Sequence, residues 1–270
     1  MNRFHRIILW LTLTSVTTTG FAFDQGHEAW DRLLKSHVHW NAEGTASMVD
    51  YQGMQRERKQ LNGYLESLST VTRDEYDQWS KQQQLAFLIN AYNAFTVELI
   101  LTRYPDIASI KDLGSLFSSP WKKRFFSLLG QKRHLDNIEH DMIRKPGVFD
   151  DPRIHVAVVC ASIGCPALRN EAFTSERLDH QLDNNLNRFL SDRSRNRYNP
   201  STGELEVSRI FDWYREDFEK GHRGISSLKD LFASNADLLT DDPTAMERIR
   251  NKKVDIDYLD YDWRLNALHQ

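Results

Sequence analysis

The sequence predicts an α+β fold: a helix-rich single domain around a small β-sheet. Two features of the chain lead to this fold class. Several long segments place apolar residues at helical spacing, and one of them, residues 80–104, is apolar on nearly all sides. By contrast, residues 153–160 form a short apolar run rich in β-branched side chains, which is typical of a buried central strand. We therefore expect the helices to pack around that strand.

Length and composition agree with one globular domain. The chain has 270 residues, of which 40% are hydrophobic and 27% are charged. This is enough apolar material to bury a full core. The formal net charge of −3 gives no broad positive surface, so we expect no nucleic-acid partner. No glycine-rich loop that would cradle a phosphate is present, and the sequence predicts no cofactor.

The N-terminal segment has the pattern of a cleaved secretory signal peptide. Arg3 and Arg6 precede the apolar residues 7–11, and Gly20 and Ala22 are small residues of the kind that a signal peptidase reads. We expect a signal peptide at 1–22 and a mature domain at 23–270, which would be periplasmic or secreted. The apolar core is too short for a membrane span, and no later stretch is expected to cross a bilayer after cleavage.

The first part of the mature chain is expected to form packing helices. The predicted elements are a helix at 25–39, an extended piece at 47–51, a helix at 54–68 and the buried helix that begins near Ser80 and ends at Pro105. Within the buried helix, Asn90 and Asn93 are three residues apart and point the same way. Buried amides need hydrogen-bond partners, so both either hold neighbouring loop backbone or take part directly in a site.

Two short elements are expected before the central strand. Residues 115–133 are predicted to be a loop leading into a short helix, and residues 135–144 another short helix that carries Glu139 and His140. A lone histidine on a short helix is more often structural or at the surface than catalytic. His140 becomes a candidate for a site only in the company of other polar groups.

Both cysteines lie at the end of the predicted strand. Side chains alternate along a strand, so His155 and Cys160, which are an odd number of residues apart, would lie on opposite faces. The base for a Cys160 nucleophile would then have to come from another segment. Pro166 favours the start of a short helix there, with Cys165 as its N-cap.

The C-terminal part is predicted to return to helices with two further strands. The expected elements are a helix at 174–190, a turn at 198–203, a strand at 204–208, a helix at 210–218, a helix at 225–232, one more short helix, and a final strand and turn at 254–263. The chain shows no internal repeat and no low-complexity segment.

Five motifs, in order along the chain, resemble the family catalogued as domain of unknown function 547. They are LAFLINAYNA at 85–94, IEH at 138–140, RIH at 153–155 with CASIGCP at 160–166, SRIFDWY at 208–214, and YLDYDW at 258–263. The resemblance extends over about 49–266 and implies an uncharacterised, exported bacterial member. It also implies that His140, His155 and Cys160 belong to the family pattern, whereas some members have serine in place of Cys165. A disulfide is then not common to the family, although Cys160 and Cys165 can still form one here.

The first of three open functions is a thiol-dependent hydrolase or acyl transferase. Cys160 would be the nucleophile, with His140 as the base from the preceding helix and His155 as the other candidate histidine. Orienting or oxyanion-stabilising groups would come from Asn90, Asn93 and Glu139. The identity of the substrate or ligand is not encoded in any motif.

The other two functions do not use a free thiol. His140, His155, Cys160 and Cys165 are plausible zinc ligands, but they lack the closely spaced ligand pairs of a strong metal motif, and no metal site is predicted. In the third function the protein is a non-catalytic binding or scaffolding domain in which the motif residues lock the core. The two cysteines would then be either a local disulfide, which an oxidising compartment favours, or a pair of buried thiols.

Overall fold

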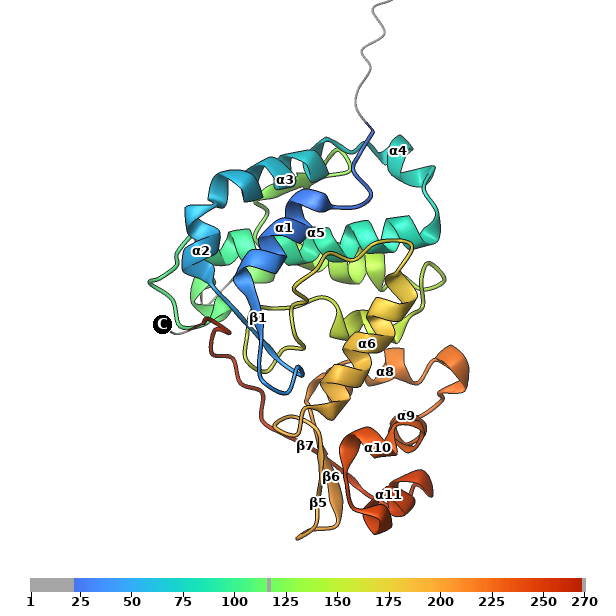
Figure 1. Cartoon of the computed structure of the whole chain (residues 1–270). Coiled ribbons are helices and arrows are strands. Elements are labelled where there is room, and N and C mark those ends of the chain that lie inside the picture. The colour runs from blue at the N-terminus through green and yellow to red at the C-terminus, as the bar shows by residue number, and fades with distance from the viewer. Residues whose placement is uncertain (1–21, 116–117, 269–270) are drawn as a thin grey trace, which may run out of the picture.

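The structure is a computed structural model, and it describes residues 22–115 and 118–268. The predicted signal peptide lies outside the described residues, apart from its last position. The helix-rich α+β fold class is confirmed. Figure 1 shows α1 to α5 gathered at one end of the molecule and β5 to β7 with α9 to α11 at the other. Each end has its own cluster of buried apolar side chains.

The N-terminal elements follow the sequence prediction closely. They are α1 (Glu28–His37), β1 (Val38–Trp40), β2 (Ser47–Val49), α2 (Tyr51–Arg56), α3 (Arg58–Thr70) and α4 (Arg73–Asp77). The strands β1 and β2 pair in an antiparallel hairpin. The helix predicted at 54–68 is in fact two helices, because the chain turns at Glu57 between α2 and α3.

The central element is α5 (Lys81–Leu101), which is buried on nearly all sides as predicted. Ser80 begins it with a capping box: its hydroxyl accepts from the Gln83 amide at 3.2 Å, and the Gln83 side chain accepts from the Ser80 amide at 2.9 Å. By length and composition α5 could cross a membrane, contrary to our expectation for the mature chain. Its most apolar part is 94% buried within the protein, as in the core helix of a globular domain.

The stretch between α5 and the cysteines contains more strand than predicted. It forms η1 (Ile110–Leu113), η2 (Pro120–Lys122), the antiparallel hairpin of β3 (Phe126–Leu128) with β4 (Gln131–Arg133), and η3 (Asn137–Ile143). The short helix predicted at 135–144 exists, but its hydrogen bonds are those of a π-helix. Short π-helical turns are rare in proteins, and those that occur are often found at functional sites.

The buried central strand predicted at 153–160 is wrong. Residues Pro152–Val156 form a 3₁₀ helix, η4, and residues 157–160 are not in a strand either. Pro152 occupies the first helical turn, and the Asp151 carboxylate caps the turn by accepting from the Arg153 amide.

Side-chain amides replace the missing strand partner. Asn93 donates to the Ala157 carbonyl at 2.9 Å and accepts from the Val159 amide at 3.0 Å. Asn185 of α6 donates to the Val156 carbonyl at 2.8 Å. The backbone of this apolar run is therefore satisfied without a β-ladder, so its burial does not require a sheet.

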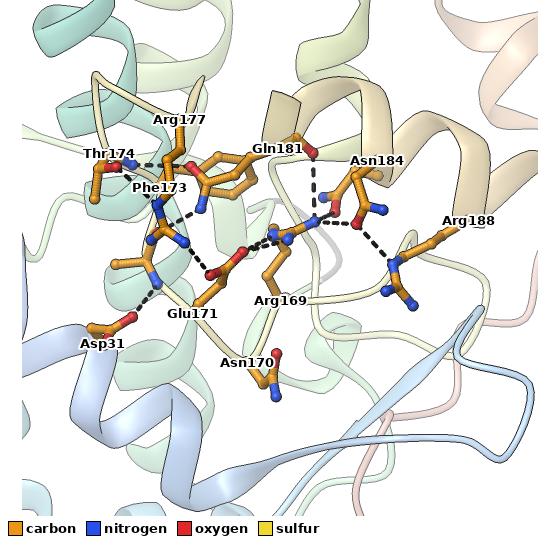
Figure 2. A network of polar contacts seen from close by, with 12 residues as sticks. Asp31, Arg169, Asn170, Glu171, Phe173, Thr174, Arg177, Gln181, Asn184 and Arg188 are labelled. Atoms are coloured by element: carbon orange, nitrogen blue, oxygen red, sulfur yellow. Dashed lines mark hydrogen bonds and ion pairs between the residues drawn. The ribbon is translucent and has the colours of Figure 1, made fainter. Parts of the chain in front are cut away.

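The short helix predicted after Pro166 is also absent, and an extended loop runs on to α6 (Leu178–Ser191). Figure 2 shows the polar network that fixes this loop. Arg169 forms an ion pair with Glu171 and donates to Asn184 at 2.9 Å and to Asn185 at 2.6 Å. Charged and amide side chains thus hold this loop in place. No apolar helix face is needed for that, so the sequence of the loop has no helical periodicity.

The C-terminal part contains α7 (Ile210–Trp213), α8 (Arg215–Phe218), η5 (His222–Gly224), α9 (Leu228–Ser234), α10 (Ala236–Leu239), α11 (Pro243–Arg250) and one sheet. The sheet order is β5 (Arg197–Asn199), β6 (Glu204–Val207), β7 (Ile256–Tyr258). The predicted strand at 204–208 is confirmed as β6, which pairs in parallel with β7. The sheet lies at one end of the molecule instead of at its centre (Figure 1).

After β7 the chain returns to the cysteine loop. The Ile163 amide donates to the Arg264 carbonyl and the Gly164 amide to the Asp262 carbonyl, both at 2.8 Å. A Cβ atom on Gly164 would lie 3.0 Å from ring carbons of Tyr261, so this close approach favours glycine. The final segment thereby brings aromatic residues from the end of the chain against the cysteines.

Candidate functional site

A pocket of about 350 Å³ opens where η3, η4 and the final segment of the chain meet. Its walls are aromatic and consist of Tyr92, Trp121, Trp213, Tyr214, Tyr261 and Trp263. The polar and sulfur-bearing lining residues are Asp136, Glu139, His140, His155 and Cys160. Val158 and Ile210 complete the lining. The combination of apolar walls with a few convergent polar groups is typical of a small-molecule site.

His155 has a fully buried side chain with one nitrogen bound and one free. Its Nε2 lies 2.8 Å from Oδ2 of Asp217, and its ring stacks on Tyr214 with centroids 3.7 Å apart. Among the described residues, Nδ1 has no hydrogen-bond partner. His155 lines the pocket, and its unpaired Nδ1 is itself buried.

Asp217 is held in its ionised form. Besides His155, it accepts from Nε of Arg144 and from Nζ of Lys220, each at 2.6 Å. Burial opposes ionisation, but the hydrogen bonds from His155, Arg144 and Lys220 outweigh it and hold the pKa of Asp217 below its ordinary value. Burial in turn lowers the pKa of His155, against the hydrogen bond to Asp217 that raises it. The arrangement fits a neutral imidazole that donates through Nε2 and carries its lone pair on Nδ1.

Two carboxyl groups of the pocket differ in their partners. Glu139 is buried, and it accepts from the hydroxyl of Tyr214 at 2.7 Å and interacts with the hydroxyl of Tyr92. Asp136 is half-buried, and its carboxylate accepts no hydrogen bond from the described residues. Burial raises the pKa of Asp136. Asp136 is thus the carboxylate that remains open to a ligand.

Cys160 and Cys165 form a disulfide beside the pocket. Cys160 is half-buried and lines the pocket, whereas Cys165 is buried behind it. The Tyr261 hydroxyl lies 3.0 Å from Sγ of Cys160 and 3.1 Å from Sγ of Cys165, and Ser162 Oγ lies 3.2 Å from Sγ of Cys160. Ala161 has a left-handed backbone (φ 59°), a strained conformation that is common at functional sites.

Four of the six site residues chosen from the sequence line this pocket: Cys160, His140, His155 and Glu139. The prediction that His155 and Cys160 face opposite ways is wrong, because the chain between them starts as a 3₁₀ turn and does not alternate like a strand. His140 is exposed, and its Nδ1 accepts from Arg144 at 2.7 Å.

The other two, Asn90 and Asn93, do not line the pocket. Asn90 donates to the Phe173 carbonyl at 2.7 Å and accepts from its amide at 3.0 Å. Asn93 likewise donates to the Ala157 carbonyl and accepts from the Val159 amide. Both amides therefore fix loop backbone, which was one of the two roles considered for them.

Sequence reasoning missed the partners that arrive from the C-terminal half. Asp217, Tyr214 and Tyr261 were not chosen as site residues, although they lie in or beside the motifs that carry the family resemblance. Asp217 is 62 positions from His155, and Tyr261 is 101 positions from Cys160. The repeated aromatic residues at 211–214 and 258–263 were the available signal.

The structure does not support the metal alternative built from His140, His155, Cys160 and Cys165. Within the described residues, no group of three or more His, Cys, Asp or Glu side chains is placed to hold a metal ion. Both sulfurs are engaged in the disulfide, and His155 is engaged with Asp217.

Comparison with known proteins relates part of the chain to a protein family. Residues 76–190 match the model of a family described as "Protein of unknown function, DUF547". No curated protein and no solved structure matches the chain. The matched segment contains α5, η3, η4 and both cysteines. The match confirms the family resemblance for the motifs that lie within 76–190, and this segment, which supplies Glu139, His140, His155 and Cys160 to the pocket, is related to the DUF547 family of unknown function. The motifs at 208–214 and 258–263 lie outside the matched segment, so the wider resemblance over 49–266 stays a prediction.

Proposed function

We propose that the pocket is the active site of a thiol-dependent hydrolase or acyl transferase, with reduced Cys160 as the nucleophile and His155 as the base. One observation supports this most: Cys160 and His155 line the same pocket, and His155 is backed by Asp217 with its other ring nitrogen free. Nucleophile, base and orienting carboxylate are the parts of a catalytic triad.

The reaction would proceed in two steps. The Cys160 sulfur attacks the carbonyl carbon of an ester or amide while Nδ1 of His155 takes the thiol proton; the bond to the leaving group breaks, and His155 passes the proton to it. Water then attacks the thioester, His155 takes a proton from the water, and the carbon–sulfur bond breaks to restore the thiol. An acyl transferase would use a second substrate in place of water.

The neighbouring residues have supporting roles in this proposal. Asp217 fixes the tautomer and the orientation of the His155 ring, and Arg144 and Lys220 keep Asp217 ionised. His140 is the weaker base candidate, because it is exposed and its Nδ1 already accepts from Arg144.

The disulfide makes the proposed activity depend on reduction. A dithiol reductant would attack the Cys160–Cys165 bond, form a mixed disulfide, and leave as a cyclic disulfide, with two protein thiols as products. We propose that the protein works outside the cytoplasm, after removal of the leader, where such a pair is oxidised unless a dedicated reductant acts on it.

The test compares two serine variants of the full mature protein, because both lack the disulfide and share any effect on folding. The probe is p-nitrophenyl acetate. Cys165→Ser leaves Cys160 free and should hydrolyse the probe without reductant, with a transient acetyl group on the Cys160 peptide in mass spectra. Cys160→Ser should show no acetylation and background hydrolysis. Equal rates in the two variants would overturn the proposal.

The disulfide itself favours a second candidate function, a non-catalytic binding domain in which the bond is structural. In that case Cys165→Ser would lose thermal stability, since a native disulfide commonly contributes about 2–5 kcal/mol, but it would gain no esterase activity. Activity gained on loss of Cys165 separates the two candidates.

A further inference from the structure

We infer that the pocket binds an ammonium-bearing small molecule, which would be the amine-containing part of a substrate or ligand. The inference deepens the proposed function by naming the class of molecule for the same pocket. It does not depend on thiol chemistry, because it rests on the charges, rings and free nitrogen of the pocket and holds with the disulfide closed.

The charge of the lining favours a cation. Asp136 and Glu139 are acidic, and none of the described lining residues is lysine or arginine. The two protein cations that contact pocket rings, Lys111 and Arg144, do not line the pocket. Glu139 has two tyrosine hydroxyls as partners, whereas the Asp136 carboxylate has no hydrogen bond from the described residues. His140, His134 and Lys122 act on Asp136 only at a distance, without a hydrogen bond or ion pair among the described residues, so a ligand cation would be its first direct counter-charge.

The aromatic walls favour the same kind of ligand. Trp213 contacts Tyr261 with ring centroids 4.9 Å apart and Trp263 at 5.8 Å, and Tyr261 lies 4.5 Å from Trp263. Such electron-rich faces attract an ammonium group. The Trp263 ring already binds one: the ammonium of Lys111 lies 3.6 Å from its centroid. Trp213 is 46% exposed, which is unusual for so large an apolar side chain and leaves one of these rings open to a ligand.

The unpaired nitrogen of His155 adds to this argument because His155, unlike His27, lines the pocket. His155 is 3% exposed, and its Nδ1 has no partner among the described residues. Leaving a buried polar atom unpaired costs stability unless a bound molecule or water satisfies it. In the tautomer that Asp217 selects, Nδ1 is an acceptor, as is the Asp136 carboxylate. The unpaired acceptors therefore favour a ligand that is positive or donates hydrogen bonds.

A neutral sugar would also donate hydrogen bonds and stack on tryptophan, but it would leave the carboxylate charge uncompensated. The pocket volume of about 350 Å³ fits a small molecule. Since Lys111 already occupies the Trp263 ring, we assign the ammonium group to the part of the pocket lined by Asp136, Trp213 and Tyr261.

The experiment measures binding by tryptophan fluorescence to the oxidised wild-type protein, with choline and its uncharged isostere 3,3-dimethyl-1-butanol as probes. Choline should bind at least about tenfold more tightly than the isostere. Equal binding of the two, or binding of methyl glucoside with none of choline, would overturn the inference.

Three variants locate the site. Asp136→Asn should remove most of the preference for choline, whereas the matched control Asp260→Asn, whose side chain is fully exposed and does not line the pocket, should retain it. Trp213→Leu alters an exposed ring with little risk to folding, and it should weaken choline binding as well. Unchanged preference in both Asp136→Asn and Trp213→Leu would refute this placement. Since the disulfide stays closed, these results are independent of the esterase test.

Discussion

His27 and His155 are two buried histidines that look alike until their partners are compared. Each has one ring nitrogen in a hydrogen bond and one without a partner among the described residues. Burial lowers the pKa of both, that of His27 to about 4 against the opposing charge of Asp24. His27, however, lies in the N-terminal core and is hydrogen-bonded to the hydroxyl of Tyr64. His155 is hydrogen-bonded to the ionised carboxylate of Asp217 and lines a pocket.

The comparison shows which features of a buried histidine indicate function. Burial and an unpaired nitrogen are common to both, so neither feature distinguishes a catalytic from a structural imidazole. The difference is a charged partner that sets the tautomer, together with a place in the lining of a pocket. By these two criteria only His155 of the pair is a candidate base.

The largest expected effect comes from removing each imidazole in turn. In the Cys165→Ser background, His155→Gln should lower p-nitrophenyl acetate turnover by about 10²–10⁴-fold, because the thiol loses its general base. His27→Gln should leave turnover unchanged and lower thermal stability. Turnover that falls equally in both variants would show that the two histidines do not differ in role.

The stability of the protein should depend on pH through His27. Its folded pKa of about 4 lies below the unfolded value of 6.5, so the unfolded state binds more protons between these values. The stabilisation is complete above pH 6.5 and is lost as the pH falls towards 4, by roughly 3 kcal/mol for this residue. Urea unfolding across this range should show a shallower pH dependence in His27→Gln than in the wild type. An identical dependence would contradict the assignment of a neutral His27.

Replacing Asp217, the charged partner of His155, should make His155 a weaker base without abolishing turnover. Asp217→Asn keeps the size of the side chain but no longer favours the tautomer with its lone pair on Nδ1, so turnover should fall by about 10²-fold. Asp230→Asn, which also removes a salt-bridged carboxylate but lies away from the pocket, should leave turnover unchanged. A change in the pH profile of turnover in Asp217→Asn alone would separate its role from a structural one.

The smallest effect concerns the amides of α5. Asn93→Ala removes both hydrogen bonds to the backbone before Cys160 and should cost about 2 kcal/mol in the free energy of unfolding. Asn187→Ala on α6, whose side chain is exposed, should cost little. Equal losses in chemical denaturation would contradict the structural role of Asn93.

The sequence was a good guide where local pattern determines structure. The helix α5 could be predicted because its residues are apolar on nearly all sides and Ser80 with Gln83 forms a capping box. The run at 153–160 was misassigned because a short β-branched apolar segment looks the same whether a strand or side-chain amides satisfy its backbone. The amides of Asn93 and Asn185 come from two different helices, and periodicity carries no sign of that pairing.

The candidate site could be predicted in part: residues in neighbouring motifs could be chosen from the sequence, and residues from distant segments could not. His140, His155, Glu139 and Cys160 are in motifs close to one another in the chain, so they could be chosen together. Asp217 reaches His155, and Tyr261 reaches the pocket, only through tertiary packing, the latter by way of the backbone contacts of the final segment with the cysteine loop. Their role follows from the fold and not from any local spacing.

The central claim is that His155 activates the Cys160 thiol, and the pH dependence of alkylation tests it most directly. Iodoacetamide would be reacted with Cys165→Ser and with Cys165→Ser/His155→Gln, and modification of the Cys160 peptide would be followed by mass spectrometry. The account predicts that alkylation of the first protein has its midpoint below the ordinary thiol value of about 8.5, and that the midpoint rises when His155 is replaced. The same midpoint in both proteins would contradict it.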